Sequence, residues 1–173
     1  MKCQALDRAD EPLMTADIET YLSEEDERIA PEEEERYEVC FVCSGNTCRS
    51  PMAEAYYNHR HGNGNRVAIS AGLSPRPGDP INPLAVRALD RAGIEPTDEN
   101  DYPSHEAQEI TDEIFESCHR VCAVTSQIAF LLILNFPLYA DKITALEQDV
   151  ADPYGGDLAQ YEATLEQIID LLA

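Results

Sequence analysis

Apolar residues recur along the chain in short β-rich runs that alternate with helical patterns. Four such runs predict buried strands, at residues 38–42, 67–71, 120–124 and 142–146. Strands that alternate with helices are typical of a parallel sheet with crossover connections. The pattern therefore predicts an α/β fold, a three-layer sandwich whose central parallel, four-stranded twisted sheet is flanked by helices.

Helices are predicted between these strands, at residues 50–61, 83–92, 111–117, 127–135 and 157–172. Pro51 falls in the first turn of the first helix, where its missing N–H is not needed, and Gly93 ends the second. In the last helix the apolar residues recur at the spacing of one buried face, which includes Tyr161. We therefore expect Tyr161 to belong to the core.

The longest apolar run extends from Ile128 to Phe136 and coincides with the fourth predicted helix. A helix that spans a bilayer needs about 20 apolar residues, so this run is too short for one. We interpret it as a buried helix and expect no membrane partner.

Residues 1–37 differ from the rest in composition, because they are rich in acidic side chains, including the run Glu32–Glu35. So few apolar residues give such a segment little core to form. We predict a disordered acidic extension, followed by a single domain over residues 38–173. No apolar stretch typical of a secretory signal is visible at the N-terminus, which favours a cytoplasmic location with reduced thiols.

The formal net charge is -22, from 34 acidic and 12 basic residues. A surface of this sign repels phosphate backbones, so no nucleic-acid partner is expected. The six cysteines include no pair of C-x-x-C motifs, and His59 and His61 are expected at a solvated helix end. No metal site is predicted.

The stretch from Cys43 to Pro51 (CSGNTCRSP) carries the strongest chemical signal. A predicted strand ends there, a short loop follows, and a helix begins. Such a junction directs backbone N–H groups toward one point at the positive end of a helix dipole, where an oxyanion binds well. We predict a phosphate-binding loop after the first strand, formed by Ser44, Gly45, Asn46, Thr47, Cys48, Arg49 and Ser50, with Gly45 allowing close approach.

Two side chains convert this anion site into a candidate active site. The helix dipole and the Arg49 guanidinium would both stabilise a thiolate on Cys43. Arg49 can also donate two parallel N–H bonds to phosphate oxygens, which lysine cannot do. A nucleophile and a guanidinium around one anion site suit in-line attack on phosphorus.

A second motif, Asp152 to Gly156 (DPYGG), lies near the C-terminus. Displacement of an alkoxide or phenoxide needs a proton donor, and the Asp152 carboxyl is the candidate. Tyr154 could line a substrate pocket with its aromatic ring.

The residues CSGNTCRSPMAE and DPYGG together resemble the low-molecular-weight protein-tyrosine-phosphatase family, from about Glu38 to the C-terminus. The resemblance implies that Cys43 is the nucleophile and forms a phosphocysteine, that Arg49 holds the phosphate, and that Asp152 is the general acid. It implies phosphorylated proteins as substrates, inorganic phosphate as product, a monomer or weak dimer, and no cofactor.

The resemblance also assigns supporting roles. Ser50 would hydrogen-bond the Cys43 sulfur, and Asn46, Ser70 and His105 would brace the loop. Cys48 matches a second loop cysteine that forms a reversible disulfide with the nucleophile under oxidation.

Two departures from the family pattern concern the substrate. Thr47 replaces the bulky aliphatic residue usual in eukaryotic members and resembles bacterial members that act on phosphoarginine. The segment from Ser104 to Glu109 lacks the usual basic residues after the histidine. Phosphotyrosine and phosphoarginine therefore both remain open as substrates.

Two other functional classes compete with a phosphatase. A thiol-coupled arsenate reductase shares this fold but needs two further cysteines as a relay, and Val124 occupies the position where the first is expected, with Cys118 and Cys122 preceding it. Pro51 also fits the phosphatases better. A catalytically idle phosphate-binding module is disfavoured because Cys43, Arg49 and Asp152 are all present.

Overall fold

The computed structural model describes residues 37–173, which form a four-stranded sheet covered by helices. The strands are β1 (Tyr37–Cys43), β2 (Ala68–Gly72), β3 (Cys118–Ala123) and β4 (Ile143–Ala145), in the spatial order β2-β1-β3-β4. Every neighbouring pair is parallel. The predicted α/β fold is confirmed.

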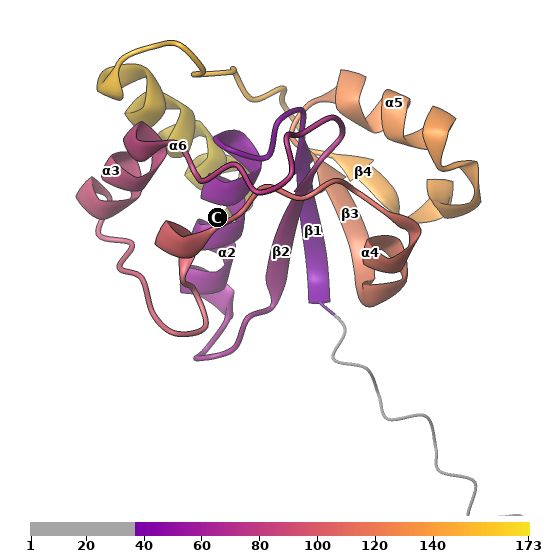
Figure 1. Cartoon of the computed structure of the whole chain (residues 1–173), viewed down its shortest axis with the longest axis horizontal. Coiled ribbons are helices and arrows are strands. Elements are labelled where there is room, and N and C mark those ends of the chain that lie inside the picture. Colours follow the sequence, from indigo (N-terminus) through magenta and orange to yellow (C-terminus); the bar gives the residue numbers. More distant parts are fainter. Residues whose placement is uncertain (1–36) are drawn as a thin grey trace, which may run out of the picture. The chain divides into compact units, whose positions relative to one another are not determined.

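Five α-helices lie within the described residues: α2 (Arg49–His61), α3 (Pro83–Arg91), α4 (Asp112–Ser117), α5 (Ser126–Asn135) and α6 (Leu158–Leu172). Helices α2, α3 and α6 lie on one side of the sheet, and α4 and α5 lie on the other (Figure 1). Two short 3₁₀ helices, η1 (Tyr102–Ser104) and η2 (Pro137–Lys142), were not predicted.

The strand order explains why helices cover both faces. The chain leaves β1 through α2 to reach β2 on one side, then returns past β1 to β3 and continues through α5 to β4. Parallel crossovers are right-handed, so reversing the direction of travel along the sheet moves the connecting helix to the opposite face. The reversal occurs between β1 and β3, and ligands of open α/β sheets bind outside the carboxyl ends of strands at such a point.

Helix ends match local signals in the sequence. The side chains of Asn82, Thr111 and Thr125 accept bonds from the first turns of α3, α4 and α5. Asp157 and Gln160 form a reciprocal capping box at α6. Predicted and observed boundaries of the helices and strands differ by no more than two residues.

The core lies between the sheet and its helices, with β1 at its centre. Val39, Cys40, Phe41 and Val42 are almost fully buried. Tyr161 on α6 is fully buried as well, which confirms its expected place in the core.

The expectation that the apolar run 128–136 forms a buried helix was only half right. The helix α5 is present, but Phe130 is 62% exposed and Leu134 is 61% exposed. The inner face of α5 packs on the sheet through Ile128, Ala129 and Leu132, and no described residue covers the outer face. A single layer of helices on a sheet buries only the side of each helix that faces the sheet. The residues on the opposite side of α5 are therefore exposed, although they are apolar.

The predicted acidic extension, residues 1–37, lies outside the described residues except for Tyr37. Within residues 37–173, no helix has the length and apolar character needed to cross a bilayer.

Candidate active site

The loop from Ser44 to Cys48 connects the end of β1 to the start of α2, at the carboxyl edge of the sheet (Figure 1). Beside it, β3 ends at Ala123, so the loop lies at the point where the strand order reverses. The first turn of α2 offers N–H groups that have no partner within the helix, and the cap residue Cys48 makes no side-chain cap.

The carbonyl groups of this loop point outward. Those of Cys43 and Ser44 accept N–H bonds of 2.9 Å from Leu73 and Ser74, and that of Thr47 accepts one of 2.8 Å from Asn82. In a trans peptide the N–H of the next residue points opposite to the carbonyl. The amides of Ser44, Gly45 and Cys48 are therefore turned inward, toward the site expected for the anion.

Asn46 holds the loop together from its centre. It is fully buried and has a φ of 54°, in the left-handed region where asparagine is tolerated. Its amide nitrogen donates to Ser50 Oγ at 2.9 Å and to Ser70 Oγ at 3.0 Å. Within residues 44–48, Asn46 is the one residue with a positive φ.

The Cys43 sulfur lies at the base of the loop and is 3% exposed. Ser50 Oγ is 3.0 Å from Cys43 Sγ, and the backbone N–H of Asn46 donates to the same sulfur at 3.2 Å. The Asn46 N–H is thus a donor to this sulfur, and the Ser50 hydroxyl, which also lies 3.4 Å from the carbonyl oxygen of Ala71, is within hydrogen-bonding range of it.

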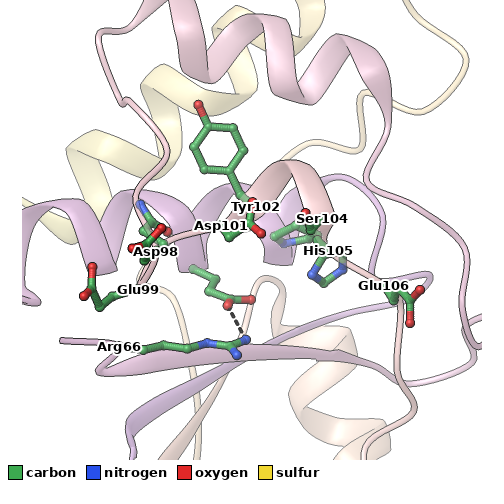
Figure 2. Close-up of a pocket in the computed structure, with 11 residues that line it drawn as sticks. Arg66, Asp98, Glu99, Asp101, Tyr102, Ser104, His105 and Glu106 are labelled. Atoms are coloured by element: carbon green, nitrogen blue, oxygen red, sulfur yellow. Dashed lines mark hydrogen bonds and ion pairs between the residues drawn. The ribbon is translucent and has the colours of Figure 1, made fainter. Parts of the chain in front are cut away.

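A buried carboxylate that sequence reasoning missed completes the support behind the loop. Ser70 Oγ donates to Glu54 at 2.6 Å. Arg66, labelled in Figure 2, forms an ion pair of 2.8 Å with the same carboxylate. The side chain of Glu54 is 11% exposed, so it needs these partners. The signal was available: Glu54 follows Ser50 by four residues and so lies on the same face of α2.

The segment after η1 braces the loop from a distant part of the sequence. His105 Nε2 lies 2.8 Å from the carbonyl oxygen of Asn46, which can only accept, so Nε2 carries the proton. Gln108 donates its backbone N–H to Asn46 Oδ1 at 2.9 Å and its side-chain amide to Ser70 O at 2.9 Å. Gln108 is a second residue that the sequence did not reveal.

Gly72, at the end of β2, packs so closely against the loop that no side chain fits at this position. A Cβ there would lie 2.9 Å from Ser44 O and 2.9 Å from Pro75 Cβ. At Gly45 it would meet only Thr47 Oγ1, at 3.9 Å. The close approach at Gly72 is therefore one between β2 and the loop, and the approach of a bound anion to Gly45 stays a prediction.

Arg49, at the start of α2, forms an ion pair with Asp152. Arg49 Nη2 lies 3.0 Å from Asp152 Oδ2, and Arg49 Nη1 donates to the carbonyl oxygen of Val150 at 3.4 Å. The Arg49 side chain is 8% exposed and that of Asp152 is 52% exposed. The guanidinium is thus held rigidly, with its acidic neighbour facing solvent.

The loop that carries Asp152 is tied to both neighbouring helices. Asp149 accepts bonds from the backbone N–H and hydroxyl of Ser126 at the start of α5, and Gln167 on α6 donates to Asp149 O at 3.0 Å. Asp152 Oδ1 accepts the N–H of Tyr154 at 3.2 Å. These bonds bring a residue 109 positions after Cys43 to the same cavity.

That cavity has a volume of about 210 Å³. It is lined by Cys43, Gly45, Thr47, Cys48, Arg49, Asp152 and Tyr154. Tyr154, which is predicted to lie beside a substrate, lines this cavity and is 75% exposed. The structure thus brings together all the predicted nucleophile, clamp, acid and pocket residues.

Cys48 lines the same cavity. Its sulfur is 3.3 Å from the hydroxyl of Tyr161 and 3.7 Å from Thr47 Oγ1. Burial raises the pKa of the Cys48 thiol above its ordinary value, and the two hydroxyl contacts act in the opposite direction. The sequence placed Tyr161 in the core but gave no indication of this contact.

A second cavity, of about 430 Å³, lies against the supporting residues (Figure 2). Glu54 and His105 line it, together with the carboxylates of Asp98, Glu99, Asp101 and Glu106. Among residues 37–173 there is no group of three or more His, Cys, Asp or Glu side chains that could hold a metal ion.

Comparison with known proteins gives the family. A family model described as low molecular weight phosphotyrosine protein phosphatase matches residues 38–173. A protein-arginine-phosphatase of Bacillus subtilis is 35% identical over 145 residues, which cover 78% of this chain and 91% of that protein. An arsenate reductase of Brevibacillus brevis is 31% identical over 137 residues, which cover 77% of this chain and 99% of that protein.

A solved structure agrees with these relatives. The crystal structure of a low molecular weight protein tyrosine phosphatase from T. tengcongensis is 35% identical, has a TM-score of 0.70, and covers 79% of this chain and 95% of its own. The resemblance found in the loop and in DPYGG thus extends over the whole described fold. This chain belongs to the low molecular weight phosphotyrosine protein phosphatase family.

Proposed function

We propose that Cys43, Arg49 and Asp152 of this protein phosphatase hydrolyse phosphoarginine in protein substrates through a phosphocysteine. The observation that carries the proposal is the geometry of the cavity. Cys43, Arg49 and Asp152 all line it, and Arg49 and Asp152 form an ion pair of 3.0 Å there.

In the first step, the Cys43 thiolate attacks phosphorus, and an S–P bond forms as the bond to the leaving group breaks. Arg49 and the loop amides hold the phosphoryl oxygens as charge develops on them. The electron pair of the broken bond stays on the leaving atom, which takes a proton from the Asp152 carboxyl.

In the second step, Asp152 is a carboxylate and takes a proton from water as that water attacks the phosphocysteine. The S–P bond breaks, and its electron pair returns to the Cys43 sulfur. Ser50 and the Asn46 N–H, at 3.0 and 3.2 Å from this sulfur, stabilise it as a leaving thiolate.

The choice of phosphoarginine rests on Thr47 and Tyr154. Thr47 lines the cavity with a short side chain whose hydroxyl can accept an N–H bond, leaving room for a planar guanidine. The exposed ring of Tyr154 offers a face on which a guanidinium stacks. Among the relatives described above, the protein from Bacillus subtilis is an arginine phosphatase.

The test compares turnover of two peptides of the same sequence, one with phosphoarginine and one with phosphotyrosine. We expect the wild-type protein to favour phosphoarginine in kcat/KM, and Thr47→Ile to reduce that ratio by roughly tenfold or more, since the larger side chain fills the guanidine space. Thr144→Ile, at an exposed strand position, is the matched control and leaves the ratio unchanged.

A wild-type preference for phosphotyrosine, or an unchanged ratio in Thr47→Ile, would reject the proposed specificity. Phosphotyrosine is the second candidate, supported by the same catalytic geometry and by the phosphatase from T. tengcongensis.

The arsenate reductase alternative is disfavoured by the positions of the remaining cysteines. Cys118 pairs with Tyr37 at the start of β1, whereas Cys43 ends that strand. Because Tyr37 and Cys43 lie six residues apart on β1, Cys118 is displaced from Cys43 by about 20 Å along the strand direction. Cys122 is buried in β3, which raises the pKa of its thiol. A relay from Cys43 through this pair is not supported.

A further inference from the structure

The hydrogen bond between Tyr161 and Cys48 links helix α6 to a cysteine that lines the active-site cavity. Tyr161 is fully buried, and Cys48 is 4% exposed. The phenol oxygen lies 3.3 Å from the sulfur, within range of a hydrogen bond to sulfur. The mechanism proposed above uses neither side chain.

The Tyr161–Cys48 contact could affect chemistry at Cys43, because Cys48 lies near Cys43. Both cysteines line the same cavity, where burial and the neighbouring groups act on the pKa of the Cys48 thiol in opposite directions. The negative charges of Cys43 and Asp152 raise the pKa of Cys48, as burial does, whereas Tyr161 and Thr47 lower it. The cationic Arg49 follows Cys48 in sequence and lines the same cavity.

We propose that Tyr161 is a positioning residue that, by donating its O–H to the Cys48 sulfur, sets how fast Cys48 forms a disulfide with an oxidised Cys43. The inference rests on the proposed function in one respect, namely that Cys43 is the reactive thiolate of the site.

The redox steps balance with hydrogen peroxide as the oxidant. The Cys43 thiolate attacks the peroxide, the O–O bond breaks, and a sulfenic acid and hydroxide form. The Cys48 thiolate then attacks the Cys43 sulfur. The S–O bond breaks, its electron pair leaves with the hydroxide, and a disulfide results.

The second step needs Cys48 as a thiolate, and burial opposes that form. Tyr161 is a suitable donor because its own pKa is raised by burial and by Cys48, so it keeps its proton across the neutral range. A phenol that donates to the sulfur favours the thiolate over the thiol. Loss of the hydroxyl should therefore slow closure of the disulfide at neutral pH.

The test uses the full reduced chain, treated with hydrogen peroxide and quenched with dimedone, which traps a sulfenic acid. Peptide mass mapping measures trapped Cys43 against the Cys43–Cys48 disulfide over time, between pH 6 and pH 10. In Tyr161→Phe we expect closure about tenfold slower at pH 7, the loss of about 1.4 kcal/mol. The difference should narrow at high pH, where both proteins carry the Cys48 thiolate.

Tyr57→Phe is the matched control, because Tyr57 is also buried and its hydroxyl bonds to Glu38, far along the strand from the loop. It should close at the wild-type rate. Cys48→Ser should give only trapped or overoxidised Cys43. If Tyr161→Phe fails to fold, 3-fluorotyrosine at position 161, a stronger donor, should shift the pH profile of closure to lower pH.

Closure by Tyr161→Phe at the wild-type rate with the same pH profile would overturn the proposal, as would the absence of a Cys43–Cys48 disulfide in the wild-type protein. The readout is the mass of the peptides and not turnover. Normal disulfide closure in a protein without phosphatase activity would therefore contradict the proposed function alone.

Discussion

The guanidinium of Arg49 and the carboxylate of Asp152 form an ion pair of 3.0 Å beside the Cys43 sulfur. The pair joins the group expected to bind phosphate to the group expected to move protons, although 103 residues separate them in sequence. Because Arg49 is almost fully buried and Asp152 is half exposed, the guanidinium is the rigid partner. A bound phosphate would share Arg49 with Asp152 and bring the carboxyl next to the leaving group.

Replacement of the proposed nucleophile tests the whole mechanism. Cys43→Ser should lose turnover of an aryl phosphate by about 10⁴-fold or more, since an alcohol is a far weaker nucleophile than a thiolate at neutral pH. Cys122→Ala, which removes a different buried thiol, should keep its activity. Wild-type turnover in Cys43→Ser would rule out the phosphocysteine.

Replacement of Asp152 separates its role as an acid from its contact with Arg49. Asp152→Ala should slow a substrate with a poor leaving group by about 10²- to 10⁴-fold and one with an activated leaving group much less, because only the former needs the proton. Asp141→Ala, at an exposed position, is the control. The measurement is kcat across a series of aryl phosphates, and equal losses along the series would remove Asp152 as the acid.

The buried Glu54 should contribute to stability more than a surface carboxylate with the same kind of partner. Glu54→Gln weakens bonds to Ser70 and Arg66, and we expect a loss of about 1–3 kcal/mol in the free energy of unfolding. Glu162→Gln is the matched control, because its ion pair with Arg91 is exposed and should contribute at most about 1 kcal/mol. Equal losses in urea unfolding would show that the network behind the loop adds no stability.

The large negative charge predicts an effect of salt on substrate capture. With a net charge of -22, the protein repels acidic phosphoproteins at low ionic strength, and salt screens that repulsion. We expect kcat/KM for an acidic phosphoprotein to rise roughly threefold or more between 20 and 200 mM salt. A lysine-rich phosphopeptide should show the opposite trend. The same response for both substrates would contradict the electrostatic argument.

Stability should fall at alkaline pH. Burial raises the pKa of the thiols of Cys40 and Cys122 and of the phenols of Tyr102 and Tyr161. As pH rises, the unfolded chain therefore loses these protons at a lower pH than the folded chain does. Stability is complete below the unfolded values, at about 8.5–10, and is lost as pH rises above them, by up to about 1.4 kcal/mol per group and pH unit.

Urea unfolding at pH 7, 9 and 10.5 measures this loss. Tyr161→Phe should show a smaller decrease than the wild-type protein between pH 9 and 10.5, because one of the titrating groups is gone. A decrease of the same size in both would show that Tyr161 does not contribute to it.

Much of the active site was readable from local sequence because its parts are close together along the chain. The loop from Cys43 to Ser50 folds between a strand and a helix whose ends are marked by Cys43 and Pro51. Two of its supporting residues, Glu54 and Gln108, were missed. Glu54 was hidden because a glutamate on a helix is usually solvated, and Gln108 was hidden because its bonds depend on a loop 62 residues away.

The sequence by itself determined the order of strands and helices and indicated the candidate anion-binding loop with its candidate reactive groups, because each depends on neighbours within a few residues. Tertiary structure decided that Asp152 faces Arg49, that Tyr161 faces Cys48, and that α5 leaves its outer face uncovered. Such contacts depend on how separate elements pack, and packing is a property of the whole chain that no local pattern encodes.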